Sequence, residues 1–196
     1  MPVSPARAGA HGVLDPATLF RLRGLLPLPV VFVIVAWSQP TPASFLYGGA
    51  AVLLGTAVRF WAAGYFEGRG LDEFRADLLV TAGPYAFVRH PVYLGNFLIG
   101  LGFCVVANWW LAFPLYFATF AYVYRAVVAY EERQLAALFG AAYQRYCEEV
   151  PRFWPRLSPY RAGSGRFSVI NSLRGEWLAW CAHAALAALF AVKLIS

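Results

Sequence analysis

Charged residues are scarce in this sequence. Asp, Glu, Lys and Arg make up only 13% of its 196 residues, against roughly 25% in an average soluble domain. This shortage excludes an ordinary water-soluble globule, since 60% of the residues are hydrophobic. The apolar residues fall in blocks of about 15 to 23, a length that crosses a bilayer as an α-helix. We therefore predict an all-α, polytopic transmembrane bundle that forms one membrane domain over residues 1–196.

Cysteine is also rare, with only Cys104, Cys147 and Cys181 present. An odd number of cysteines without C-x-x-C or Cys/His ligand spacing indicates neither a disulfide framework nor a metal site. The sequence also lacks G-x-S-x-G, G-x-x-x-x-G-K and H-E-x-x-H, and it has no G-x-G-x-x-G after a predicted strand. These absences remove the usual sequence support for serine hydrolases, P-loop enzymes, zinc proteases and Rossmann dehydrogenases.

The net charge of +6 does not indicate a nucleic-acid partner. The basic residues lie between the apolar blocks, whereas a nucleic-acid-binding domain gathers them in one soluble patch. The bilayer is therefore the expected partner, and the oligomeric state stays open.

Five apolar segments are expected to cross the membrane, and they cover residues 22–38, 44–66, 92–108, 110–129 and 177–195. The first contains Pro27 and Pro29 and begins with Arg21 and Arg23, whose side chains would have to reach back to the interface. We expect this segment to be retained as a span, because no A-x-A cleavage site follows it.

The basic residues outside these spans are distributed unevenly. With five spans, one side of the membrane holds Arg7, Arg21, Arg23, Arg69, Arg75, Arg89, Arg133, Arg145, Arg152, Arg156, Arg161, Arg166 and Arg174. Lys193 alone lies near the opposite side. Because cytoplasmic loops carry the excess of Lys and Arg, we predict an inner-membrane protein whose N-terminus and active site face the cytoplasm.

The third and fourth spans form a tight hairpin, because little more than Asn108-Trp109-Trp110 joins them. At 1.5 Å per residue, the two helices rise roughly 26 Å and 32 Å from this turn to His90 and Glu131. These two residues are therefore expected to return to the same cytoplasmic face.

Two segments at that face, 81–95 and 131–155, contain groups suited to chemistry. Arg89 and His90 precede the first turn of the third span, where free backbone N–H groups favour an anion. Glu131 and Glu132 end the fourth span and open an amphipathic helix along the membrane surface. The alternative is structural, with Arg89 anchoring the third span and the two glutamates solvated or paired with Arg125 or Arg133.

Together these groups match the needs of S-adenosylmethionine, although a nucleotide phosphate would also suit Arg89 and His90. Arg89 or His90 would hold its carboxylate, and Glu131 or Glu132 would hold its ammonium or ribose. The adenine ring or sulfonium would stack on an aromatic side chain, for which the candidates are Tyr93, Tyr143 and Tyr146.

Four motifs in a fixed order carry a family resemblance. They are G-P-Y at 83–85, R-H-P-x-Y-x-G at 89–95, E-E-x-x-L-x-x-x-F-G-x-x-Y-x-x-Y at 131–146 and V-P-R-F-x-P at 150–155. This order and spacing resembles the integral-membrane methyltransferases, the superfamily of isoprenylcysteine carboxyl methyltransferase and phospholipid N-methyltransferase. The resemblance covers about residues 44 to 156, so the tail from about 157 with its fifth span lies outside it.

The resemblance implies a multi-helix enzyme that binds S-adenosylmethionine from the cytoplasm and admits a lipid-like acceptor from the bilayer. Carried over by position, the cofactor-binding residues would be Arg89, His90, Tyr93, Gly95, Glu131, Tyr143 and Tyr146, and the catalytic residues Glu131, Glu132 and Arg152. The acceptor would be a prenylcysteine-like carboxylate or a phospholipid-like amine. Only an ammonium acceptor would need a base, for which Glu131, Glu132 or His90 would serve.

Two other functions stay open at this point. Sterol reductases, which use a nicotinamide cofactor, resemble the same superfamily in their C-terminal half, so a membrane reductase using NADPH is one alternative. A membrane protein without enzymatic activity is the other, with the motifs only anchoring helices.

Overall fold

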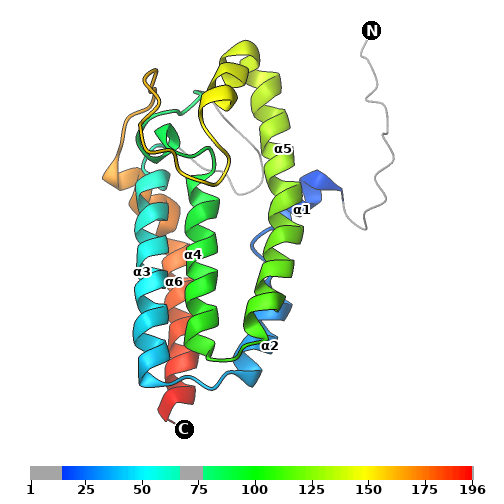
Figure 1. The fold of residues 1–196 in the computed structure, drawn as a ribbon, viewed down its shortest axis with the longest axis vertical. Coiled ribbons are helices and arrows are strands. Elements are labelled where there is room, and N and C mark those ends of the chain that lie inside the picture. Colours follow the sequence, from blue (N-terminus) through cyan, green and yellow to red (C-terminus); the bar gives the residue numbers. More distant parts are fainter. Residues whose placement is uncertain (1–14, 67–76, 196) are drawn as a thin grey trace.

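The computed structural model describes residues 15–66 and 77–195, and every regular element in these ranges is helical. The elements are α1 (Pro16–Leu22), α2 (Leu28–Trp37), α3 (Pro42–Ala63), the 3-10 helix η1 (Gly83–Ala86), α4 (Pro91–Ala107), α5 (Ala112–Glu149) and α6 (Val169–Ile195). Helices α3, α4, α5 and α6 run along the long axis of the bundle (Figure 1). The predicted all-α class is confirmed, while Arg7, Arg69 and Arg75 lie outside the described residues.

Three of the helices, α3, α5 and α6, are long and apolar enough to cross a membrane. Helices α2 and α4 are shorter apolar helices. Each predicted span therefore overlaps an apolar helix, but the helices begin and end at other residues than the predicted spans do.

The first predicted span, 22–38, is not one helix. Helix α1 ends at Leu22, and α2 begins only after Pro27. A proline has no backbone N–H and fits the start of a helix, so it separates the two pieces. The 10 residues of α2 rise only about 15 Å, which is half of the hydrocarbon thickness.

Helix α1 precedes the first predicted span, in a region where the sequence predicted no helix. The Asp15 carboxylate begins it by accepting hydrogen bonds from the backbone N–H groups of Ala17 and Thr18. Its buried Phe20 packs in one cluster with Tyr93 and Val127. Helix α1 therefore lies against α4 and α5 at the level where α4 begins.

Helix α5 continues well past the expected end of the fourth span at residue 129. It runs to Gly140, which has φ 49° and ψ −124°, and this left-handed conformation is open to glycine at little cost. The helix kinks there, and residues 141–149 turn back over the end of the bundle (Figure 1). The surface helix expected from residue 131 is therefore shorter, and Glu131 and Glu132 project from the straight part of α5.

Helix α6 begins at Val169, eight residues before the predicted fifth span. The earlier start brings Glu176 into the helix, where it is 1% exposed. At the other end, the Lys193 ammonium donates hydrogen bonds of 2.8 Å to the carbonyl oxygens of Val35 and Ala36. Lys193 thus adds hydrogen bonds to carbonyls in the last turn of α2.

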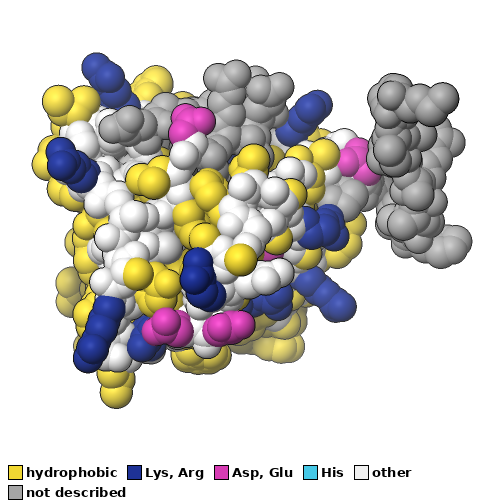
Figure 2. Space-filling model, turned by 90° about the horizontal axis from the view of Figure 1, so that it is seen from above, with side chains coloured by type: hydrophobic (Ala, Val, Ile, Leu, Met, Phe, Trp, Pro, Cys, Tyr) yellow, Lys and Arg dark blue, Asp and Glu magenta, His cyan; other side chains and the backbone are white. Residues whose placement is uncertain are grey.

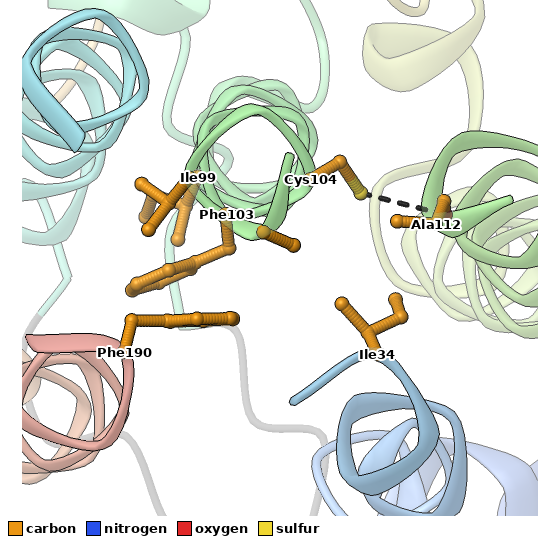
Figure 3. Packing of buried hydrophobic residues seen from close by; sticks show 8 residues of the cluster. Ile34, Ile99, Phe103, Cys104, Ala112 and Phe190 are labelled. Atoms are coloured by element: carbon orange, nitrogen blue, oxygen red, sulfur yellow. Dashed lines mark hydrogen bonds between the residues drawn. The ribbon is translucent and has the colours of Figure 1, made fainter. Parts of the chain in front are cut away.

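The apolar core lies at the end of the bundle away from the start of α4. Figure 3 shows side chains from α2, α4, α5 and α6 meeting there, among them Ile34, Ile99, Phe103, Cys104, Ala112 and Phe190. The rings of Phe103 and Phe190 stack with centroids 6.0 Å apart. The α4–α5 hairpin turns next to this core, where Asn108 has φ 49° and ends α4.

Helices α3 and α4 pack backbone to backbone through glycines. A methyl group added to Gly48 would lie 2.5 Å from the carbonyl oxygen of Gly102, and one added to Gly55 would lie 2.6 Å from that of Gly95. Small residues that allow such close approach are the usual means of helix association in membranes.

We expect Gly48→Ala to destabilise the protein by about 1 to 3 kcal/mol, because the added methyl group forces α3 away from α4. Gly49→Ala is the matched control, since a methyl group there meets nothing within 4 Å. Alanine favours a helix over glycine, so the control is expected to be neutral or slightly stabilising. Thermal unfolding in lipid nanodiscs measures both, and equal shifts in Tm would contradict the close packing.

Candidate functional site

The candidate site lies where α4 begins, beside the middle of α5. Arg89 and His90 immediately precede Pro91, the first residue of α4. Glu131 and Glu132 reach them from α5, and Arg152 comes from the segment that follows α5. The prediction that the two hairpin ends return to one face is therefore confirmed.

Backbone hydrogen bonds hold the segment after α5 against the segment before α4. The N–H of Arg89 donates to the carbonyl of Pro151 at 2.8 Å, and the N–H of Tyr160 donates to the carbonyl of Ala86 at 2.9 Å. Pro151 ends the helix because it lacks a backbone donor. This pairing fixes where Arg152 lies.

Glu132 is the centre of the ionic cluster. Its Oε1 lies 3.1 Å from Arg89 Nη1 and 3.2 Å from His90 Nε2. Arg152 binds the same carboxylate with two of its guanidinium nitrogens, Nε at 2.9 Å from Oε1 and Nη2 at 2.6 Å from Oε2. Only 12% of the Glu132 side chain is exposed, so the three cationic groups compensate for its desolvation.

Glu131 is less completely bound. Its Oε1 accepts a hydrogen bond of 2.5 Å from the Tyr93 hydroxyl. Its Oε2 lies 3.6 Å from His90 Nδ1, a charge contact that is longer than a hydrogen bond. Glu131 therefore has one carboxylate oxygen with capacity for a further donor.

Burial of the imidazole alone would lower the pKa of His90, but its interactions with Glu131 and Glu132 outweigh burial and raise the pKa above the ordinary value of 6.5. The hydrogen bonds to Glu132 likewise raise the pKa of Arg152. The contacts with the two carboxylates therefore favour the protonated, hydrogen-donating form of His90.

Two buried polar atoms beside this cluster have no hydrogen-bond partner among the described residues, Nε of Arg89 and the hydroxyl of Tyr143. Arg89 Nη1 also donates to Cys147 Sγ at 2.9 Å. In contrast, the Tyr146 hydroxyl donates to the carbonyl of Tyr85 at 2.7 Å. Of the two predicted tyrosines on α5, only Tyr143 offers a free polar group.

Gly95 lies on the side of α4 that faces α3. A methyl group there would lie 2.6 Å from Arg59 Cγ and 2.8 Å from the carbonyl oxygen of Gly55. This helix contact explains a glycine at position 95 without a ligand.

The structural alternatives for the ionic residues are not what the structure shows. Glu131 and Glu132 are mostly buried and pair with His90, Arg89 and Arg152, whereas Arg125 and Arg133 are exposed. Arg59 lies within the second predicted span, where an arginine is expected to extend its side chain to the interface. Instead, it lies inside the bundle and binds Glu176, a partner that was missed because the fifth span was placed from residue 177.

Figure 2 shows the face at the site end of the bundle, where basic side chains are spread around apolar groups and acidic groups are fewer. Within the described residues, no group of three His, Cys, Asp or Glu side chains is arranged to hold a metal ion.

Known proteins similar to this chain include two named for metal resistance. It is 33% identical over 172 residues to the cobalt-zinc-cadmium resistance protein CzcN of Cupriavidus metallidurans, covering 83% of this chain and 77% of CzcN. It is 39% identical over 119 residues to the nickel-cobalt-cadmium resistance protein NccN of Alcaligenes xylosoxydans xylosoxydans, covering 60% of this chain and 52% of NccN.

A third similar protein has a named enzymatic activity. The chain is 35% identical over 80 residues to protein-S-isoprenylcysteine O-methyltransferase of Schizosaccharomyces pombe, covering 41% of this chain and 34% of that enzyme.

No solved structure matches the chain. The phospholipid methyltransferase family matches residues 43–142, about half of the chain. This range includes Arg89, His90, Glu131 and Glu132. The chain belongs to the phospholipid methyltransferase family of integral-membrane proteins, as its motifs predict.

Proposed function

We propose that this protein transfers a methyl group from S-adenosylmethionine to a lipophilic acceptor in the membrane. The observation that carries this proposal is the mostly buried cluster of Arg89, His90, Glu131 and Glu132 at the end of apolar helices, which the exposed Arg152 joins from the surface. Ionisable groups placed at a membrane boundary and kept from lipid are typical of a functional site.

The groups left free in this cluster fit the cofactor. Arg89 Nε and the Tyr143 hydroxyl are donors without partners, and they suit the carboxylate or ribose oxygens of S-adenosylmethionine. Glu131 Oε2 accepts no hydrogen bond shorter than its 3.6 Å contact with His90, and it suits the ammonium group. When bound, the cofactor supplies a methyl group already activated by the positive sulfur.

The other residues position these groups. Arg152 and His90 fix the Glu132 carboxylate, which in turn holds the Arg89 guanidinium beside Tyr143. Tyr93 orients Glu131. Because the methyl group needs no further activation, the protein contributes alignment and the exclusion of water.

The charge state of His90 bears on the question of a base. The two carboxylates beside it raise its pKa, which favours a role as a hydrogen-bond donor over that of the base that an ammonium acceptor would require. The arginines near the site and Lys193 in the last turn of α6 support a cytoplasmic orientation of the site, because cytoplasmic loops carry the excess of basic residues. The acceptor then enters from the bilayer beside α4 and α5.

We expect Glu131→Gln to weaken S-adenosylmethionine binding at least about tenfold, because a neutral amide cannot replace the charge-assisted hydrogen bond to the ammonium. Glu148→Gln is the matched control, since Glu148 is exposed on the same helix beyond the kink. Titration calorimetry in nanodiscs gives the two values of Kd. Wild-type affinity in folded Glu131→Gln would refute this role.

The raised pKa of His90 also predicts a dependence of stability on pH. A group whose pKa is higher in the folded protein contributes stability that is complete below its unfolded value, here 6.5, and disappears as the pH rises through the folded value. We expect Tm to fall over this range in the wild type and to change less in His90→Gln. Parallel slopes for the two proteins above pH 6.5 would show that His90 gains no proton affinity on folding.

A further inference from the structure

A second polar network lies deeper in the bundle than the ionic cluster. Arg59 of α3 binds Glu176 of α6 with two nitrogens, Nε at 2.7 Å from Oε2 and Nη2 at 3.0 Å from Oε1. Its Nη1 contacts Asn96 Oδ1 of α4, and Asn96 Nδ2 donates to the Tyr124 hydroxyl of α5 at 2.8 Å. The network therefore joins α3, α4, α5 and α6.

This network has a fixed direction. Arginine has only donors, so the amide oxygen of Asn96 must face Arg59 and its NH₂ group must face Tyr124. The Tyr124 oxygen thus accepts a hydrogen bond, and its own proton has no acceptor among the described residues. The chain of donors ends in a free O–H group on a partly exposed side chain.

The Tyr124 hydroxyl is well placed for a membrane-embedded acceptor. Tyr124 precedes Glu131 by seven residues on α5 and so lies about 10 Å deeper along the helix. Its ring packs on that of Tyr93 with centroids 4.8 Å apart, and the Tyr93 hydroxyl binds Glu131. Tyr124 is thus the next polar group below the ionic cluster on the path from the bilayer.

We propose that the Tyr124 hydroxyl, oriented by Asn96 and Arg59, binds the polar end of the acceptor, and that this acceptor is a carboxylate or a thiolate and not an amine. The inference rests on the proposed methyl transfer and names its substrate class. An ammonium group has only donors and needs an acceptor, whereas the Tyr124 oxygen already accepts from Asn96 and presents its O–H donor. A neutral amine would use the single lone pair that it needs for attack.

A carboxylate or thiolate has several lone pairs, so it accepts from Tyr124 and attacks with another pair. The acceptor atom forms the new bond to the methyl carbon, the bond from that carbon to sulfur breaks, and its electron pair stays on sulfur. The anion becomes a neutral ester or thioether, and no proton has to leave. This agrees with a site in which contacts with Glu131 and Glu132 favour the protonated form of His90.

The buried ion pair explains why the donor is maintained in an apolar region. Glu176 is 1% exposed and Arg59 14%, and charged groups at membrane depth are costly unless they are paired. Arg59 and Glu176 compensate each other and hold Asn96 in one orientation. Asn96 and Arg59 are therefore positioning residues, whereas Tyr124 touches the acceptor.

The test uses three probes of equal chain length, octanoate, octanethiol and octylamine, with the full chain in nanodiscs and labelled S-adenosylmethionine. We expect labelled methyl octanoate or methyl octyl sulfide, and the product tells which acceptor is used. Labelled N-methyloctylamine is expected to be absent. Methylation of octylamine at a rate equal to or above that of both other probes would overturn the inference.

Two variants test the role of the hydroxyl. Tyr124→Phe keeps the ring and removes the donor, so KM for the preferred probe is expected to rise at least roughly tenfold while the Kd of S-adenosylmethionine is unchanged. Asn96→Asp draws the Tyr124 proton toward the new carboxylate and is expected to raise KM similarly. Tyr122→Phe is the control, since Tyr122 is 60% exposed on the same helix. An unchanged KM in Tyr124→Phe would overturn the role of this hydroxyl.

Binding without turnover separates this inference from the proposed function. Without any methyl donor, octanoate is expected to raise the Tm of the wild type and of Tyr122→Phe but not of Tyr124→Phe. If no probe is methylated and S-adenosylmethionine does not bind, the proposed function fails. The shift in Tm caused by octanoate then tests acceptor binding at Tyr124 independently of methyl transfer. Equal shifts in all three proteins would overturn this binding role.

Discussion

The arrangement of the site depends on one buried carboxylate, that of Glu132. A mostly desolvated carboxylate is stable only with cationic donors around it, and here Arg89, His90 and Arg152 supply them from two segments outside α5. The α4–α5 hairpin brings the first two into reach, and backbone pairing of residues 151–160 with 86–90 brings the third. The same interaction therefore joins the segments at this end of the bundle, where donors of Arg89 and Tyr143 have no hydrogen-bond partner among the described residues.

The charged groups form two levels along the bundle. The Glu132 cluster lies where α4 begins, and the Arg59–Glu176 pair lies within the helices below it. Tyr93 and Tyr124 connect the levels through ring packing and hydrogen bonds at either end. A polar cofactor held at the upper level and a lipophilic acceptor held at the lower level would meet between them, which gives the methyl transfer a direction relative to the membrane.

Much of this could be predicted from the sequence, because apolar blocks of bilayer length and a very short turn dictate a hairpin whose ends share a face. The ionic residues followed from that geometry and from the family motifs. The kink at Gly140 and the split at Pro27 were missed, since hydropathy does not record where one glycine or proline bends an apolar run. The Arg59–Glu176 pair was missed because its two residues are 117 positions apart in sequence, and only the packing of α3 against α6 brings them together.

The most direct test of the central claim is titration calorimetry of the wild-type protein in nanodiscs with S-adenosylmethionine and, separately, with NADPH. We predict saturable binding of S-adenosylmethionine, competition by its demethylated form and no binding of NADPH. Binding of NADPH alone would contradict the account and indicate a membrane reductase. Binding of neither, to protein with a cooperative thermal transition, would contradict it as well and indicate that the ionic cluster only holds the helices together.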